Sequence, residues 1–413
     1  MIRPQRPTGP ARRALSALIC AATATCAAPA AASASVSAPA TASASVSDAA
    51  GQQPAHRPSL PRVLVVAQDG SGQFTSIQAA FNAIAPGTDT PTTVLVRPGT
   101  YVGQIYDPAD KPNVTLIGLG RNPADTVIAD GIAHGTIAAD GNLYGTDCSA
   151  TATIAGNGFS AVNLTVANTF DLTADPVTAA RGPQAVAVKA VADRVLFAHD
   201  RFVGYQDTIF ASSYADPFQP QECFAEDGTP TPPAASTTGR AAPPPAREYF
   251  ADDYIAGTVD FLCGSATAVF DRDTIDVVSD KPGASVTAPD TPLAFTRGFL
   301  ITHSRIDDAS GVYPADVQFL GRPWRHTGVT NPVAQMTIRD TYLGALISTA
   351  PYENWSSPFF LWTDARFSEF ENTGPGAANT AADVPQLTPD QAKTYTVRSY
   401  LGDWVPLSSL LDR

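Results

Sequence analysis

The sequence has few of the residues on which several common kinds of functional site depend. Only 16% of its 413 residues are charged, and its five His are scattered without the spacing that metal ligands show. No Gly-x-Ser-x-Gly motif occurs, which disfavours a serine esterase. The apolar stretch near the N-terminus is too diluted with Ala and Thr to form a stable membrane span. We therefore expect no dedicated metal site, no serine nucleophile and no transmembrane segment.

Residues 1–57 have the composition of an export segment. Several Arg precede the small-residue stretch ALSALICAATATCAAPAAASA, which predicts a secretory signal peptide over 1–34. Residues 35–57, mostly Ser, Ala, Val, Pro and Gln, are typical of a flexible linker. The Arg12-Arg13 pair leaves a twin-Arg export route open beside the general one. We expect a secreted protein, extracellular or periplasmic, with one domain over 58–413.

The chain is strongly acidic. Residues 1–57 carry five Arg and one Asp, so the remainder has a formal charge of −17, four more negative than the −13 of the whole chain. Such a surface excludes nucleic acid as the expected partner and repels a polyanion at long range. A polyacid substrate is therefore expected to arrive with its charges masked.

A strand-and-turn signature repeats along the chain. Its copies are AVNLTV around Asn163, LFAHDRFVG around Asp200, YFADDYIAG around Asp253, VFDRDTIDV around Asp273, LITHSRIDD around Ser304 and QMTIRDTYLG around Asp340. Their spacing is uneven but the strand phase is kept, which predicts an all-β parallel β-helix with loops of different length. The segment 75–84, with Thr75 as its cap, predicts a helix that plugs one end of the coil, and 211–246 predicts a long inserted loop.

Two copies of the repeat place a second Asp seven residues after the first. If Asp200 and Asp253 lie on neighbouring rungs, Asp207 and Asp260 do too, about 4.8 Å apart. Two carboxyls so close cannot both ionise freely, which provides one acid and one base or nucleophile. We interpret Asp207 and Asp260 as catalytic. A structural ladder or turn-capping role is the interpretation for the first Asp of each pair and for two further ones, Asp273 and Asp340.

The surrounding motifs resemble those of the pectin methylesterases. In order, they are GPQAVAV (182–188), GYQDTIF (204–210), GTVDFLCG (257–264) and LGRPW (320–324), and the resemblance extends over about 60–410. It implies a single-stranded right-handed parallel β-helix with a short N-terminal capping helix and a C-terminal helical or loop tail. It also implies a monomer without cofactor or metal, which removes methyl esters from the galacturonate units of pectin (homogalacturonan), releasing methanol and pectate through an aspartyl acyl-enzyme.

The resemblance also implies roles for individual residues. Asp260 would be the nucleophile, and Asp207 would protonate methanol and then activate water. Gln184 and Gln206 would hold the oxyanion, and Arg322 would pair with Asp260. The expected substrate contacts are Trp324, Tyr205, Phe210 and Cys263, of which the last stands where the family usually has an aromatic residue.

Other functions of the same fold remain open. A β-helical glycosidase would also use two close carboxylates, and a polysaccharide lyase would need an acidic calcium cluster. Neither explains Gln184 and Gln206 beside the acid pair. A non-catalytic carbohydrate-binding relative is the third alternative, and loss of a catalytic residue, which is not seen, would favour it.

Three Cys follow the signal segment, and the sequence alone allows any pair of them to bridge. We expect a bond between Cys223, in the inserted loop, and Cys263, three residues beyond the nucleophile, because the loop could fold back over the groove. Cys148 would then be a buried free thiol.

Overall fold

The computed structural model describes residues 62–213, 223–224, 246–278, 282–325, 332–356, 358, 360–377, 384–404 and 406. All of them belong to one unit, Pro58–Arg413. The signal and linker expected over 1–57, and most of the inserted loop, lie outside the described residues.

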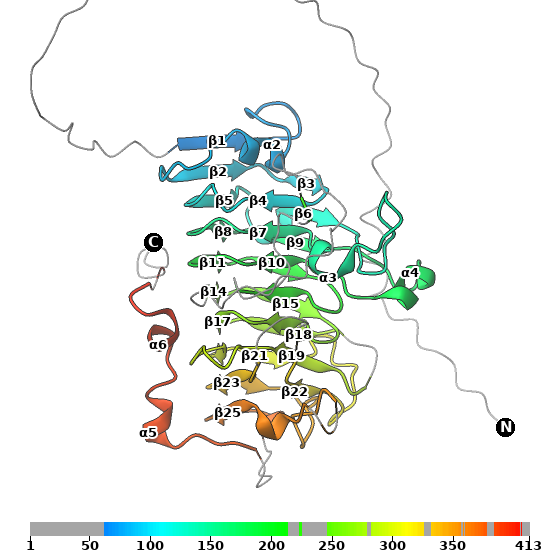
Figure 1. Cartoon of the computed structure of the whole chain (residues 1–413), viewed down its shortest axis with the longest axis vertical. Helices are drawn as coiled ribbons and strands as arrows, with labels where there is room; N and C mark the ends of the chain where they lie inside the picture. The colour runs from blue at the N-terminus through cyan, green and yellow to red at the C-terminus, as the bar shows by residue number, and fades with distance from the viewer. Residues whose placement is uncertain are drawn as a thin grey trace, which may run out of the picture. The chain divides into compact units, whose positions relative to one another are not determined.

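Strands stack into three parallel sheets, which we call A, B and C, and from β2 to β24 successive strands belong to A, B and C in turn (Figure 1). Sheet A consists of β1 (Arg62–Val66), β2 (Thr92–Val96), β5 (Val114–Gly118), β8 (Ser160–Val162), β11 (Val195–Ala198), β14 (Arg247–Ala251), β17 (Thr267–Asp271), β20 (Phe299–Thr302), β23 (Gln335–Arg339) and β25 (Arg366–Phe370). Sheet B consists of β3 (Gly99–Val102), β6 (Thr126–Asp130), β9 (Thr165–Asn168), β12 (Arg201–Val203), β15 (Tyr254–Gly257), β18 (Thr274–Val277), β21 (Arg305–Asp307) and β24 (Tyr342–Leu343). Sheet C consists of β4 (Ile105–Asp107), β7 (Ala152–Ile154), β10 (Val188–Ala190), β13 (Ile209–Ala211), β16 (Leu262–Gly264), β19 (Ser285–Pro289) and β22 (Phe319–Gly321). The predicted right-handed parallel β-helix is confirmed.

Each copy of the sequence signature forms the corner where the chain passes from sheet A to sheet B. The first corner residue has a left-handed backbone, with φ between 50° and 62°, in Asn163, His199, Asp252, Arg272, His303 and Asp340. Asn, Asp and His tolerate this conformation better than most residues, which explains why polar side chains recur there.

The second corner residue forms a ladder of hydrogen bonds between rungs. Asp200 Oδ1 accepts from the backbone N–H of Leu164 at 2.9 Å. In the same way, Asp253 Oδ1 accepts from Asp200 N–H at 2.6 Å, and Asp273 Oδ1 from Asp253 N–H at 2.8 Å. Burial raises the pKa of all three carboxyls well above the ordinary value. The structural interpretation of these three Asp is confirmed.

Asp340 has the other structural position of the corner and is not part of the ladder. Its φ of 50° places it at the first corner position, one residue before the ladder, and it pairs with Arg339 Nε at 2.7 Å. Thr341 takes the ladder position, where its hydroxyl accepts from Ser304 N–H at 3.4 Å. The Asp of this copy stands one place earlier than in its neighbours, so its carboxylate serves the corner differently.

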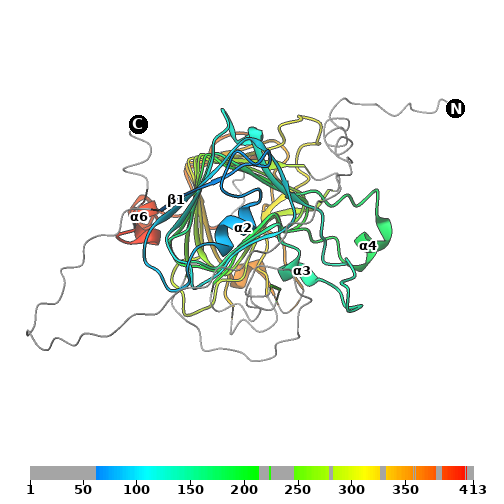
Figure 2. The same ribbon diagram turned by 90° about the horizontal axis from the view of Figure 1, so that it is seen from above.

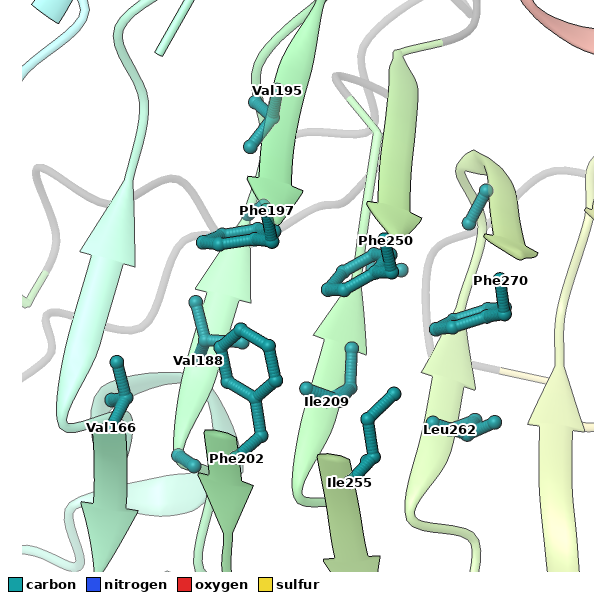
Figure 3. Packing of buried hydrophobic residues seen from close by; sticks show 14 of the residues in the cluster. Val166, Val188, Val195, Phe197, Phe202, Ile209, Phe250, Ile255, Leu262 and Phe270 are labelled. Carbon is teal, nitrogen blue, oxygen red and sulfur yellow. The ribbon is translucent and has the colours of Figure 1, made fainter. Parts of the chain in front are cut away.

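Phenylalanines from successive sheet A strands stack inside the coil (Figure 3). The ring centroids of Phe197 and Phe250 are 4.9 Å apart, and those of Phe250 and Phe270 are 4.7 Å apart. Phe202 of sheet B meets the first two edge-on. Because equivalent positions lie on neighbouring rungs, identical side chains stack, and this column fixes the register that positions the corners.

Helix α2 (Ile77–Asn82) lies across the first end of the coil, as predicted (Figure 2). Its apolar stripe, Ile77, Ala80, Phe81 and Ile84, is buried in the core. The cap is Ser76 and not Thr75: Ser76 has the extended backbone of a cap residue, and its side chain accepts from Ala79 N–H at 3.2 Å.

The C-terminal tail forms two short helices, α5 (Pro389–Ala392) and α6 (Val397–Leu401). Tyr400 and Leu401 of α6 pack on the outer face of sheet A, and Arg247 donates to the carbonyl of Leu401 at 2.9 Å. The remaining helical elements are α3 (Gly145–Cys148), α4 (Pro176–Arg181), η1 (Pro123–Asp125), η3 (Trp362–Asp364) and η4 (Pro375–Ala377). No helix in the described ranges is long and apolar enough to cross a membrane.

Glu248 is an acidic residue buried in the apolar core. It lies on β14 two residues before Phe250, so it faces the same interior. It is fully buried, and neither carboxylate oxygen has a hydrogen-bond partner among the described residues. Burial raises its pKa well above the ordinary value of 4.5. The folded chain therefore keeps it protonated where the unfolded chain ionises, and this penalty is absent below the unfolded pKa and grows as the pH rises.

We expect Glu248→Leu to raise the free energy of unfolding by about 1–3 kcal/mol at pH 8 and by less at pH 4, because it removes a buried, unpaired and titrating group. Urea unfolding at the two pH values measures this. Glu248→Gln is the matched control: it abolishes the titration but leaves an unpaired amide, so it should flatten the pH dependence with a smaller gain. A change in the free energy of unfolding of Glu248→Leu that is the same at pH 4 and pH 8 would contradict the interpretation.

Candidate active site

Two stacked turns between sheets B and C carry the predicted acid pair. The turn after β12 holds Asp207, and the turn after β15 holds Asp260. Asp207 N–H donates to Val259 at 3.1 Å, and Ile209 N–H donates to Phe261 at 2.8 Å. In the strands that follow, Ile209 pairs with Leu262. These two residues are as far apart in sequence as Asp207 and Asp260. The two Asp therefore occupy neighbouring rungs, about 4.8 Å apart along the backbone.

Both catalytic candidates have strained backbones. Asp207 has φ 62° and Asp260 has φ 49°, in the left-handed region that few non-glycine residues adopt. The preceding Gly257 permits the tight turn, since a Cβ there would lie 2.3 Å from Phe261 Cβ. The structural corners between sheets A and B have similar φ values, so this conformation alone does not distinguish the two Asp.

Asp260 is buried and held by Arg322. The guanidinium donates through Nε to Oδ1 at 2.9 Å and through Nη2 to Oδ2 at 2.6 Å. Burial raises the pKa of Asp260 to about 6, although the Arg322 pair acts to lower it. Asp260 is therefore mostly ionised at neutral pH, which suits a nucleophile.

The surroundings of Asp207 favour its protonated form. Burial, followed by the nearby Asp260 charge, raises the pKa of Asp207 well above its ordinary value, and Arg322 only partly opposes this. Asp147 adds to the rise. The environments thus push the two carboxyls apart into a protonated acid and an ionised base, which is the division that hydrolysis needs.

The two Gln of the expected oxyanion site lie on adjacent rungs. Gln184 and Gln206 form a parallel bridge, in which Ala185 N–H donates to the carbonyl of Gln206 at 3.0 Å. Gln184 is also held through its carbonyl by His134 N–H at 2.8 Å. Its side-chain oxygen is buried without a partner among the described residues. The structure therefore places the two Gln backbones on adjacent rungs, and Gln206 directly precedes Asp207.

The four expected substrate contacts divide into two groups. Phe210 and Cys263 are paired on neighbouring strands and each is 2% exposed, so neither presents a surface to a ligand. Trp324 and Tyr205 are partly exposed, and the Trp324 ring packs on Phe210 with centroids 5.8 Å apart. The expectation that Phe210 and Cys263 line the groove is corrected: they form the layer beneath Trp324.

Sequence reasoning missed two further ion pairs. Arg322 Nη1 contacts Glu353 Oε1 at 3.2 Å, on the side away from Asp260. Lys189 on β10 pairs with Asp147 on α3, and its ammonium lies 4.9 Å above the Phe210 ring. A Lys inside a buried strand needs a partner, so Lys189 carried a signal. Glu353 lies in no recognised motif, so nothing in the sequence indicated its contact with Arg322.

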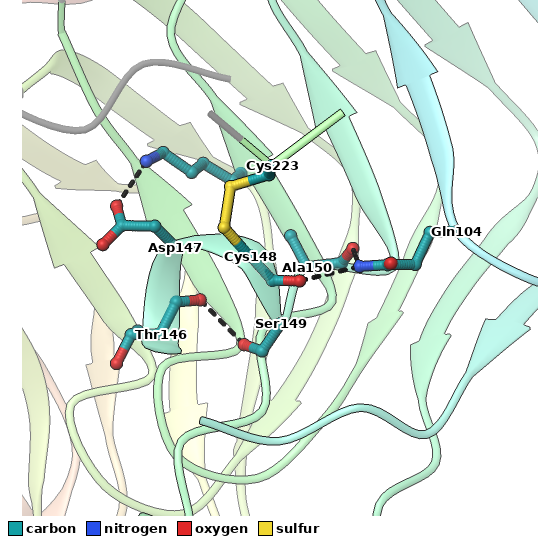
Figure 4. Close-up of a disulfide and its surroundings, with 8 residues drawn as sticks. Gln104, Thr146, Asp147, Cys148, Ser149, Ala150 and Cys223 are labelled. Atoms are coloured by element: carbon teal, nitrogen blue, oxygen red, sulfur yellow. Dashed lines mark hydrogen bonds and ion pairs between the residues drawn. A yellow bond between two sulfur atoms is a disulfide. The ribbon is translucent and has the colours of Figure 1, made fainter. Parts of the chain in front are cut away.

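The disulfide joins Cys148 to Cys223, so the predicted Cys223–Cys263 bond is wrong (Figure 4). The Cα atoms of Cys148 and Cys223 are 5.2 Å apart, and Tyr106 stacks on Phe224 beside them at 4.9 Å. Cys263 is a buried free thiol whose Sγ lies 3.4 Å from the carbonyl of Ile209. Cys263 belongs to the layer beneath Trp324, whereas Cys223 belongs to a separate apolar cluster with the end of α3.

Within the described ranges, no group of three or more His, Cys, Asp or Glu is arranged to hold a metal ion.

Three stacked parallel sheets with a buried acid pair, an Arg and two amides define the class as a β-helical hydrolase. The Pectinesterase family model matches residues 63–224 and 244–403, and the chain belongs to this family. It is 31% identical over 351 residues to Pectinesterase A of Dickeya chrysanthemi, covering 78% of this chain and 86% of the relative.

A plant relative and two solved structures agree. Putative pectinesterase/pectinesterase inhibitor 45 of Arabidopsis thaliana is 29% identical over 82% of this chain, which spans 49% of that protein's length. Pectin methylesterase PemA from Erwinia chrysanthemi is 30% identical with a TM-score of 0.68, covering 84% of this chain and 98% of that one. A pectin methylesterase in complex with hexasaccharide VII has the same identity and TM-score, over 83% and 98% of the two chains.

We expect Cys223→Ser to lower the free energy of unfolding by about 4 kcal/mol, because the bond closes a loop with a sequence separation of 75 residues. Denaturant unfolding measures the loss, and adding a reductant to the variant should lower its stability no further. Peptide mapping without reductant should find Cys148 linked to Cys223 and Cys263 free. A peptide that links Cys223 to Cys263 would contradict the assignment.

Proposed function

We propose that this chain hydrolyses the methyl esters of pectin through an acyl-enzyme on Asp260. The observation that carries the proposal is the Asp260 carboxylate, clamped by Arg322, on the rung next to Asp207, whose pKa burial raises well above its ordinary value. Membership in the Pectinesterase family supports the substrate class. The substrate is methyl-esterified homogalacturonan, whose acids are masked as neutral esters, and this agrees with the acidic chain.

The first half-reaction forms the acyl-enzyme. An Asp260 carboxylate oxygen attacks the ester carbonyl carbon, and the carbonyl oxygen becomes an oxyanion that the Gln184 and Gln206 amides stabilise. When the intermediate collapses, the bond from carbon to the methoxy oxygen breaks, and Asp207 gives its proton to the departing methanol. Asp260 is then joined to the substrate as an anhydride, and Asp207 is ionised.

The second half-reaction reverses the role of Asp207. Its carboxylate takes a proton from water while the water oxygen attacks the substrate carbonyl. The bond to Asp260 breaks, and the Asp260 carboxylate leaves toward Arg322. The free galacturonate acid is released, and both Asp return to their starting protonation states.

Subsites and cellular location complete the proposal. The partly exposed Trp324 offers a flat face to a sugar ring, Tyr205 lies on the same turn as Asp207, and Phe210 and Cys263 support this surface from beneath. Residues 1–34 act as a signal peptide, residues 35–57 as a linker and residues 58–413 as the catalytic domain. We expect a secreted monomer that needs no cofactor.

The activity test measures two products separately. The purified protein, incubated with highly methylated pectin, should release methanol without new reducing ends or unsaturated ends. Asp260→Asn should lower kcat by roughly a thousandfold or more, because an amide is a poor nucleophile. New reducing ends would instead indicate a glycosidase, unsaturated ends a lyase, and binding without any product a carbohydrate-binding relative.

The pH dependence tests the division of roles. Methanol release should fall below about pH 6, because Asp260, whose pKa is raised to about 6, becomes protonated. It should fall again at high pH, because Asp207 loses the proton that its raised pKa retains at neutral pH. Values of kcat/KM, obtained from initial rates across the pH range, measure both limbs of the profile. Asp207→Asn should abolish the alkaline limb together with most activity. A flat profile would contradict the paired mechanism.

A further inference from the structure

Arg322 is held on more than one side. Its Nε and Nη2 atoms donate to Asp260, and Nη1 contacts Glu353 Oε1 at 3.2 Å. The Trp355 ring covers the guanidinium, whose central carbon lies 4.5 Å from the ring centroid. Two carboxylates therefore share one cation, and only one of them belongs to the proposed chemistry.

Glu353 is held by the strand that leads into the arginine, β22, and by its neighbour β19. Its backbone N–H donates to Gly321 at 3.2 Å, directly before Arg322. Its Oε1 accepts from the Ser285 hydroxyl at 2.8 Å, while the Ser285 carbonyl accepts from Asp260 N–H at 2.7 Å. One residue, Ser285, thus contacts both carboxylate residues. Glu353 is part of a closed network and not a loose surface contact.

We propose that Glu353 is a positioning residue for the esterase reaction: it holds the outer side of the Arg322 guanidinium and shares its charge, which leaves Asp260 a more reactive nucleophile. The inference rests on the proposed role of Asp260. An undivided Arg322 would bind the Asp260 carboxylate more strongly and make it a weaker base.

The charged and titratable groups around Asp260 agree with this. Arg322 acts to lower the pKa of Asp260, whereas Glu353 acts to raise it. On the neighbouring rung, burial and then the Asp260 charge raise the pKa of Asp207, and Asp147 contributes to that rise. Cys263, on the strand after Asp260, keeps its proton because burial raises its thiol pKa. Glu353 is thus the outer carboxylate that competes for Arg322.

The experiment compares the acid limb of the kcat/KM profile for methanol release in Glu353→Gln and wild type. The amide keeps the shape and an oxygen acceptor but removes the charge. We expect the acid limb to move to lower pH by about half a unit, because Asp260 then pairs with an unshared cation; partial exposure of Glu353 limits the size. We also expect a severalfold lower kcat at the optimum, because a weaker base is a weaker nucleophile.

Two variants separate charge from packing. Glu353→Asp keeps the charge on a shorter side chain, so its acid limb should stay nearer to wild type than that of Glu353→Gln. Asp193→Asn is the matched control: Asp193 pairs with Arg247 at 2.7 Å, and the side-chain exposures of this pair, 26% and 27%, resemble the 24% and 22% of Glu353 and Arg322. Its removal should leave the limb unchanged.

The outcomes are distinct. An acid limb in Glu353→Gln that coincides with wild type, or that moves equally in Glu353→Asp or Asp193→Asn, overturns the role of Glu353 while Asp260→Asn remains inactive. If Asp260→Asn retains full activity, the proposed function itself fails. Melting temperature, measured for each variant, excludes misfolded samples, and Glu353→Ala, which also removes the charge, provides the comparison if Glu353→Gln does not fold.

Discussion

The site depends on the main-chain register between neighbouring rungs of the coil. The pairing of β13 with β16 sets Asp207 beside Asp260 without any direct bond between their side chains being needed. The Phe197, Phe250 and Phe270 column holds the same register from inside. Because a slip of one residue reverses which side of a strand each side chain faces, the backbone ladder and the aromatic column together keep the two Asp at equivalent positions of neighbouring rungs.

Buried Asp side chains at two positions of one rung have different roles. Asp200, Asp253 and Asp273 are buried carboxyls, and Oδ1 of each accepts a backbone N–H from the preceding rung, so they serve structure. Asp260, seven residues beyond Asp253, is also buried but finds a guanidinium instead. A buried carboxylate with a cation partner stays ionised, and one within a neutral ladder does not. The partner, more than the burial, decides which Asp can react.

The sequence predicted the parts of the molecule that repeat and missed those that depend on packing between distant segments. The strand signatures, the α2 stripe and the pairing of Asp207 with Asp260 follow from local patterns, which need no knowledge of the fold. Gln184 and Arg322 were assigned through the resemblance of their motifs to those of the family. The shift of Asp340 by one corner position and the cap at Ser76 show the limit of such patterns, since one residue decides each. The Cys148–Cys223 bond and the Glu353 contact join segments 75 and 31 residues apart in sequence, and no periodicity reports which of these meet.

Each carboxyl of the proposed acid pair is influenced by a further carboxylate. Asp147 contributes to the raised pKa of Asp207, and Glu353 contributes to that of Asp260. Both outer groups are balanced by a cation, Lys189 for the first and Arg322 for the second. The pairs Lys189–Asp147 and Arg322–Glu353 therefore shift the pKa values of the two Asp only modestly, through electrostatic interactions, and do not cancel their charges. Asp147 directly precedes Cys148, so the disulfide also fixes the source of one of these interactions.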